Sequence, residues 1–338
     1  MSLRPTARPA DPAAPVPGQP QAPAPPAAPP VAVTSLTVLT EAEGTAPGAA
    51  RRLAWLASDP DSVPLGSAFL RLLCARGQEH LAEIEVTVHP AHRRQGVGRR
   101  LLTAALDAAR EQERRSVLAQ VPGDSAAAAF LARSGFGPAL RLGFTRLARR
   151  GLDLATVRAL AEVPHQGYRL VHWAGHVPEH LLAAFVASRR AMDDMPMEDA
   201  DHGPMVWDAA RVAAATGAVA RRGDRLHTVA VADEADGSLV GFTELVVPGT
   251  GTGDAQHYGT GVLPEHRGRG LALWLKAESV RLACEQYPDL DGFLTDTALS
   301  NLPMRAVNDR LGYRPTHQEV LYQYDLGRGS RSIGAGPS

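Results

Sequence analysis

Cysteine is scarce in this sequence, with only Cys74 and Cys284 among 338 residues. The two lie in different parts of the chain and form no metal-binding spacing, so we expect two reduced thiols in a cytoplasmic protein. A surplus of one charge sign is also missing, because 35 basic residues stand against 36 acidic ones. This balance argues against a nucleic-acid or membrane-surface partner.

Long hydrophobic runs are absent as well. No apolar stretch approaches the ~20 residues that a membrane-spanning helix needs, and the N-terminus lacks the continuous apolar segment of a signal peptide. His172, His176 and His180 have the spacing of metal ligands on one helix face. Gly175 and Pro178 interrupt any such helix, so we predict no metal site.

Proline and alanine dominate residues 1–30, which contain almost no large apolar side chains. Such a segment buries too little surface to offset the entropy of ordering, so we predict a disordered, partly polyproline-like leader. Residues 328–338 predict a flexible tail for the same reason. The length of the chain suits about two domains.

The most informative feature is a pattern that occurs twice, in VTVHPAHRRQGVGRRLL and in TGVLPEHRGRGLALWLK. In each copy, an apolar strand-like segment ends near a proline and a glycine-bearing turn opens a helix. Such a turn offers unpaired N–H groups and the positive end of a helix dipole to an anion, and small residues let a pyrophosphate approach the backbone. The predicted anion-binding residues are Arg93, Arg94, Gln95, Gly96, Val97 and Gly98 in the first copy and Arg267, Gly268, Arg269, Gly270, Leu271 and Ala272 in the second.

These turns resemble the Arg/Gln-x-x-Gly-x-Gly/Ala signature of the GNAT superfamily of N-acetyltransferases, which bind acetyl-CoA through it. The resemblance covers roughly residues 31–327 and is to tandem GNAT proteins of the actinobacterial kind. It implies an α/β (α+β) fold with two GNAT-like acyl-CoA N-acyltransferase domains, each a mixed central sheet flanked by helices. The domains are expected at residues 31–150 and 167–327, joined by a linker at 151–166, with acetyl-CoA as co-substrate.

The second domain shows the complete GNAT order of elements, β α α β β β α β α β. Apolar periodicity, capping residues and turn signals indicate each element. The expected strands are Tyr168–Trp173, Arg225–Val231, Leu239–Val247, Gln256–Val262, Phe293–Thr297 and Glu319–Tyr324, and the expected helices are Pro178–Met192, Trp207–Arg221, the segment after Gly270, and Asn301–Leu311.

The first domain is shorter at its front. Residues 35–57 leave room for a strand and a loop but hardly for the two helices that form much of the acceptor-side wall in the family. We therefore predict a trimmed domain that is structural or regulatory, and a catalytic second domain. The rest of the first domain is predicted as strands Ala68–Leu73, Leu81–Val88 and Ser116–Val121 and helices Val97–Gln112 and Ser125–Arg133.

Acetyl transfer to an amine needs an oxyanion donor, a base for the amine proton and a proton for the leaving thiolate. In GNAT enzymes the donor is a backbone N–H at a bulge before the CoA turn, which corresponds to Val88 and Val262 here. Gly261 would ease such a bulge. An ordinary strand end at either position is the alternative.

Three residues are candidate bases. Glu83 and Glu85 share one face of the strand before the first turn, similar to the base-bearing strand of GNAT histone acetyltransferases, although a solvated strand face explains them as well. His257 occupies the equivalent position in the second domain, where a neutral imidazole can accept a proton. A hydrogen-bonded strand histidine is the alternative.

The last helix of each domain departs from the family, in which a tyrosine often serves as the acid. Asn308 holds that position in the second domain, where it and Asn301 can hydrogen-bond CoA but cannot donate a catalytic proton. Leu131 holds the tyrosine position in the first domain, where it can neither hydrogen-bond CoA nor donate a proton. These departures leave both domains without the usual general acid at this position.

An acidic, methionine-containing loop follows the first helix of the second domain. Its carboxylates at Asp193, Asp194, Glu198 and Asp199 can attract a cationic amine, while a solvated loop whose methionines fill core gaps is the alternative. The sequence predicts an acetyl-CoA-dependent N-acetyltransferase that acts on a small, cationic amine. The alternatives are a non-catalytic acyl-CoA-binding tandem GNAT protein and a mycothiol-synthase-like acetyltransferase.

Overall fold

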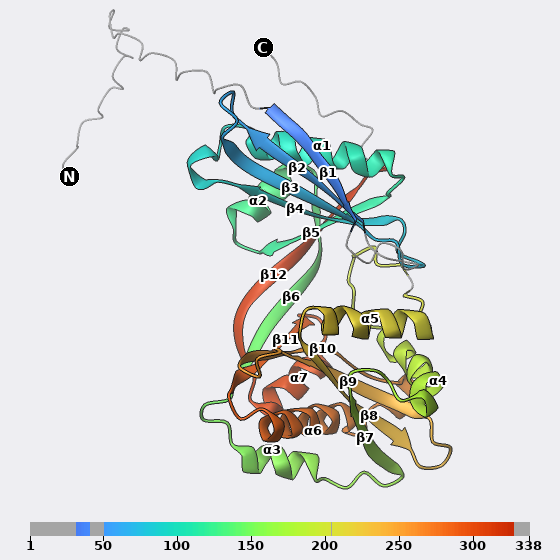
Figure 1. Ribbon diagram of the computed structural model, residues 1–338. Helices are drawn as coiled ribbons and strands as arrows, with labels where there is room; N and C mark the ends of the chain where they lie inside the picture. Colours follow the sequence, from blue (N-terminus) through green and yellow to red (C-terminus); the bar gives the residue numbers. More distant parts are fainter. Residues whose placement is uncertain (1–31, 41–50, 204, 328–338) are drawn as a thin grey trace, which may run out of the picture.

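In a computed structural model, one mixed sheet of twelve strands runs through both halves of the chain (Figure 1). The structure describes residues 32–40, 51–203 and 205–327, so the predicted leader and tail lie outside the described residues. The strand order is β1-β2-β3-β4-β5-β12-β6-β11-β10-β9-β8-β7. The first half contains β1 (Ala32–Thr40), β2 (Arg51–Ser58), β3 (Pro64–Leu72), β4 (Leu81–Val88), η1 (Pro90–His92), α1 (Val97–Glu111), β5 (Ser116–Pro122), α2 (Ala126–Arg133) and β6 (Gly137–Ala148).

The predicted element order of the second half is confirmed. Each predicted strand and helix is present, with ends that differ by a few residues. The elements are β7 (Tyr168–Ala174), α4 (Glu179–Ser188), η2 (Arg189–Met192), α5 (Ala209–Arg221), β8 (Arg225–Asp233), β9 (Leu239–Val247), β10 (Gly253–Val262), η3 (Pro264–His266), α6 (Leu271–Gln286), β11 (Leu290–Ala298), α7 (Leu302–Leu311) and β12 (Arg314–Asp325).

The shortened front of the first half is confirmed. The described residues that precede β3 form two strands and no helix. Burial along β3 therefore alternates, with Leu70 and Leu72 buried against α1 while Phe69 is 40% exposed on the other face. By contrast, β9 of the second half is buried along its whole length, because α6 and α4 both pack on it.

The two halves exchange their last strands. The sequence analysis expects a separate sheet for each half, but β12 lies between β5 and β6, and β6 lies between β12 and β11 (Figure 1). Both strands are 12 residues long, about twice the usual strand length, so each reaches partners in both halves. The junction therefore connects the halves through backbone hydrogen bonds.

The segment predicted as a linker contains a helix, α3 (Leu154–Ala161), capped by Asp153. It packs against α6 and buries Val157 and Ala161. Within the described ranges, no helix is long and apolar enough to cross a membrane, and no group of three His, Cys, Asp or Glu residues is placed to hold a metal ion.

Candidate active site

The two predicted anion-binding turns have the same backbone structure. Each consists of a strand, a short 3-10 helix, a left-handed glycine and a helix. Gly96 has a φ of 82° and precedes α1, and Gly270 has a φ of 77° and precedes α6. Because a left-handed residue at this point leaves the first N–H groups of the helix free, both turns retain the backbone of an anion site.

The same local contact holds each turn to its strand. The Nε of Arg93 donates to the carbonyl of Val88 at 3.3 Å, and the Nε of Arg267 donates to the carbonyl of Val262 at 2.8 Å. These equivalent hydrogen bonds confirm that the turns are copies of one module.

Next to each turn, the parallel strands of the sheet separate. β4 pairs with β5 only from Leu81 to Glu83, and β10 pairs with β11 only from Gly253 to Gln256. Beyond these points the strand edge that carries the turn lacks its parallel neighbour. The backbone groups on that edge are therefore available to a bound molecule.

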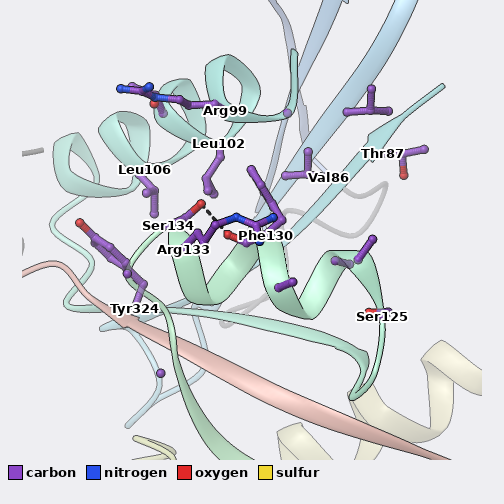
Figure 2. Close-up of a pocket in the computed structure, with 18 of the residues that line it drawn as sticks. Val86, Thr87, Arg99, Leu102, Leu106, Ser125, Phe130, Arg133, Ser134 and Tyr324 are labelled. Carbon is purple, nitrogen blue, oxygen red and sulfur yellow. Dashed lines mark hydrogen bonds between the residues drawn. The ribbon is translucent and has the colours of Figure 1, made fainter. Parts of the chain in front are cut away.

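The first turn opens into a large cavity. The cavity has a volume of about 1640 Å³ and lies between α1 and α2. Figure 2 shows Leu102 and Leu106 on α1 facing Phe130 and Arg133 on α2, with Val86 and Thr87 of β4 beyond them. Alanines on α2 keep the groove wide; Ala126, Ala127 and Ala129 all line it.

The charge of this cavity suits a polyanion. Four arginines line it, and exposed guanidinium groups recognise phosphate oxygens well. Two belong to the turn and two to the facing helices: Arg93, Arg94, Arg99 and Arg133.

In the second half, a buried polar cluster lies between α6 and α7. Lys276, the only lysine of the sequence, is 1% exposed, and its Nζ lies 2.7 Å from Oδ1 of Asn308. The Nζ also lies 4.8 Å from the centre of the Tyr313 ring. Also buried are the equivalent residues of the first half, Leu102, Leu131 and Phe136.

Burial governs the ionisation of this cluster. It lowers the pKa of Lys276 to about 7 and raises the pKa of the Tyr313 hydroxyl. Burial, with a further contribution from Lys276, holds the pKa of His257 well below its ordinary value. The Tyr313 hydroxyl and Nε2 of His257 have no hydrogen-bond partner among the described residues.

The outer side of the second turn is also covered. His165 stacks on Trp274 with 4.3 Å between ring centres, and its Nε2 lies 3.3 Å from the position of a Cβ on Gly270. The guanidinium group of Arg267 forms an ion pair with Asp194 at 2.5 Å. A phosphate group at this turn would have to displace both contacts.

The acceptor side of the second half is packed as well. A Cβ added to Gly261 would lie 2.9 Å from the sulfur of Met192 and 3.0 Å from the side chain of Ala191. The equivalent residue of the first half, Thr87, lines the open cavity. A catalytic second half stays a prediction, and the large cavity lies in the first half.

The three candidate bases have different surroundings. Glu83 accepts from Arg71 at 2.9 Å, whereas Glu85 is exposed and makes no side-chain hydrogen bond to a described residue. His257 is only 4% exposed and contacts Thr243 Oγ1 through Nδ1 at 3.3 Å. Of the three side chains, that of Glu85 is the most accessible to an acceptor.

The expected bulge is displaced. The register of β10 against β9 shifts between His257 and Gly259, not beside Val262 as predicted. In the first half, β4 pairs with β3 in unbroken register from Ala82 to Val88. Tight packing of Gly261 on η2 keeps that end of β10 regular, so the extra residue is accommodated earlier in the strand.

The two asparagines predicted to contact CoA serve the second half itself. Asn301 caps α7 by accepting from the N–H of Met304 at 3.2 Å. Asn308 is 2% exposed and also donates to Thr297 Oγ1 at 3.4 Å. Neither side-chain amide faces an open groove.

The four acidic residues of the predicted acceptor loop do not form one cluster. Asp194 pairs with Arg267, and this hydrogen bond lowers the pKa of its carboxyl group. Glu198 accepts from Ser300 at 2.9 Å, and Asp193 is exposed. Asp199 alone lines the first-half cavity.

The sequence analysis misses several residues of the cavity. Arg99 follows Gly98 directly, so its place in the motif could have indicated it. Arg133 and Tyr324 carry no such signal, because Arg133 lies on a separate helix and Tyr324 reaches the cavity from the last strand of the other half.

Comparisons with known proteins identify the family and the fold. The model of the acetyltransferase (GNAT) family matches residues 40–136 and 192–313. A mycothiol acetyltransferase of Clavibacter sepedonicus is 32% identical over 282 residues, which are 79% of each chain. The structure of a tandem GNAT protein from the clavulanic acid biosynthesis pathway is 25% identical with a TM-score of 0.64, over 87% of this chain and 86% of that one. A GCN5-related N-acetyltransferase from Sphaerobacter thermophilus, 17% identical with a TM-score of 0.60 over 81% and 80% of the chains, has the same fold.

Proposed function

Because the chain belongs to the GNAT family and is an acetyl-CoA-dependent acetyltransferase, we propose that it binds acetyl-CoA in the first-half cavity and acetylates a small, cationic amine there. One observation carries this proposal: the first turn opens into a groove large enough for the donor.

Three features of the cavity fit acetyl-CoA. The free N–H groups before α1 suit the pyrophosphate, and Arg99 and Arg133 on the two walls suit further phosphate oxygens. The separated edge of β4 provides backbone groups for the amides of the pantetheine arm. The groove between Leu102 and Phe130 provides apolar walls for its methylene groups.

The proposed base of the reaction is on β4, on the strand face that carries Thr87. Residues alternate along a strand, so Glu85 and Thr87 share a face, and Thr87 already lines the cavity. Glu85 accepts the proton of the acceptor amine, directly or through water, as the amine nitrogen forms a bond to the acetyl carbonyl carbon. The C–S bond then breaks, and CoA leaves as a thiolate that takes up a proton from solvent.

A matched pair of variants tests the location of the donor. Gly98 and Ala272 hold the same position in the two turns, and a Cβ on Gly98 has only ordinary contacts with Val88 and Phe130. Gly98→Val should fold, yet weaken acetyl-CoA binding by about tenfold or more because its methyl groups fill the pyrophosphate approach. Ala272→Val is the control.

Calorimetric titration with acetyl-CoA gives both the affinity and the stoichiometry. One molecule per chain, lost in Gly98→Val and kept in Ala272→Val, is the expected result. The opposite pattern would move the donor, and with it catalysis, to the second half.

A second candidate acceptor comes from the relative named mycothiol acetyltransferase. Its name supports acetylation of the amine of desacetylmycothiol as a specific case of the proposed reaction. Incubation with desacetylmycothiol and acetyl-CoA, followed by mass spectrometry of the product, distinguishes this acceptor from polyamines and aminoglycosides.

A further inference from the structure

A segment of the second half covers part of the first. Between η2 and α5, residues 199–203 leave their own half and pack against β6, β5 and the loop before β4. The backbone N–H of Asp199 donates to the carbonyl of Ala139 in the first half at 3.0 Å.

Asp201 holds this segment in place. One carboxylate oxygen lies 2.9 Å from Nε2 of His80, and the other accepts from Oγ of Ser116 at 2.8 Å. Its backbone N–H donates to Oε1 of Gln323 at 2.7 Å. Burial raises the pKa of the Asp201 carboxyl, but the hydrogen bonds from His80 and Ser116 outweigh it, and the pKa is lowered. The group therefore remains ionised at neutral pH.

The fit between the halves is close at the end of the segment. Gly203 has a φ of 62°, and a Cβ there would lie 2.2 Å from the carbonyl oxygen of Gly77. Beyond it, Arg211 donates to the side chain of Gln78 at 3.1 Å. These contacts leave the segment little freedom to move away from the first half.

The same segment presents a free carboxylate to the cavity. Asp199 lines it together with Thr87 of β4. Its side chain is exposed and makes no hydrogen bond or ion pair with a described residue. A carboxylate held in this way has no internal cation to neutralise it, so it can pair with a cation from outside.

We propose that the acceptor site is composite: the second half supplies its wall through residues 199–203, Asp199 binds the protonated amine of the acceptor, and Asp201 is the positioning residue that holds Asp199. This inference rests on the proposed function, because it places the acceptor beside the donor groove of the first half. It also gives the closed second half a role in catalysis without a donor of its own.

Steady-state kinetics test this proposal with spermidine, an aminoglycoside and desacetylmycothiol as probe acceptors. Asp199→Asn should raise the KM of the best probe about tenfold, while kcat and the calorimetric affinity for acetyl-CoA change little. Asp201→Asn should also raise this KM. Asp289→Asn, which removes an exposed carboxylate of the second half, should behave like the unchanged protein.

A double-mutant cycle separates positioning from a merely structural effect. If Asp201 acts through Asp199, then Asp201→Asn adds little to the KM of a protein that already carries Asp199→Asn. Equal and additive effects, or an unchanged KM in Asp199→Asn, would overturn the proposal. It is also overturned if the acetyl-CoA-loaded protein neither acetylates nor binds any of the three probes. Acetyl-CoA titration of the Gly98→Val and Ala272→Val pair tests the donor site separately, so the two failures are distinguishable.

Discussion

The Nζ of Lys276 on α6 lies 2.7 Å from Oδ1 of Asn308 on α7, and this hydrogen bond is buried. The first half has Leu102 and Leu131 at the two equivalent positions of α1 and α2. Both leucines belong to the core of that half. A polar bridge thus connects the helices in one copy, while apolar residues line or border an open groove in the other.

The two copies therefore differ in how their equivalent helices contact each other. A buried ammonium group is stable only with hydrogen-bond partners, so Lys276 and Asn308 have to remain in contact. The leucines of α1 and α2 impose no such constraint.

The base of the reaction can be identified by comparing three conservative variants. We expect Glu85→Gln to lower kcat by about 100-fold or more, because the amide cannot accept the proton of the amine. Glu83→Gln should have a smaller effect, since Glu83 is already paired with Arg71. His257→Gln should leave kcat nearly unchanged, and a large loss in that variant would place catalysis in the second half. Initial rates with the best acceptor give the comparison.

The ionisation of Lys276 can be observed directly, because it is the only lysine. In protein labelled with 13C at the lysine side chain, a single resonance should titrate with a midpoint of about 7, as burial lowers the pKa to that value. A midpoint near the ordinary lysine value would show that water reaches the cluster.

The same pKa predicts how stability depends on pH. Between about pH 7 and the ordinary lysine pKa, the unfolded chain binds a proton that the folded protein does not, so the free energy of unfolding rises with pH. From pH 7 to pH 9 the contribution is on the order of 2 kcal/mol. Urea denaturation should show this rise, and Lys276→Met should remove it.

A buried ion pair at the start of η2 should matter strongly for stability. Arg189 and Glu244 form two hydrogen bonds with side chains that are 6% and 11% exposed, and the guanidinium group lies 4.3 Å from the centre of the Trp207 ring. Glu244→Gln should destabilise the protein by about 3–5 kcal/mol, because it leaves a buried charge without its partner. The double variant Arg189→Met/Glu244→Leu should lose less of the free energy of unfolding, as measured by urea denaturation.

Added salt should weaken acceptor binding if carboxylates attract the cationic acceptor. We expect the KM of a cationic acceptor to rise with added salt, since the Debye length is ~8 Å at physiological ionic strength. Neutralising Asp193, Asp194, Glu198 and Asp199 together should raise KM more than it lowers kcat. Most of this effect should come from Asp199, because Asp194 and Glu198 already have partners. A KM that does not vary with salt would contradict the attraction.

The family and its element order were predictable because they depend on short-range patterns. The glycine at the left-handed position, the proline before it and the apolar spacing of the following helix are all local. Hence both turns, the ten elements of the second half and the shortened front of the first half follow from the sequence.

The openness of each turn was not predictable in this way, because it depends on side chains far away in the chain. His165 and Asp194 reach the second turn from other elements, and nothing near Arg267 or Gly270 in the sequence indicates them. The prediction of a catalytic second half followed from its complete set of elements, and it stays a prediction.

The amino-acid sequence by itself therefore determined which local structures form and to which family they belong, since backbone conformation and apolar periodicity are set by neighbouring residues. Only the tertiary structure decided that the halves exchange β6 and β12 and that the first turn opens into a cavity. It also brought Asp201 to His80 across 121 positions of the chain. Such contacts depend on how whole elements pack, and no local pattern specifies the partner.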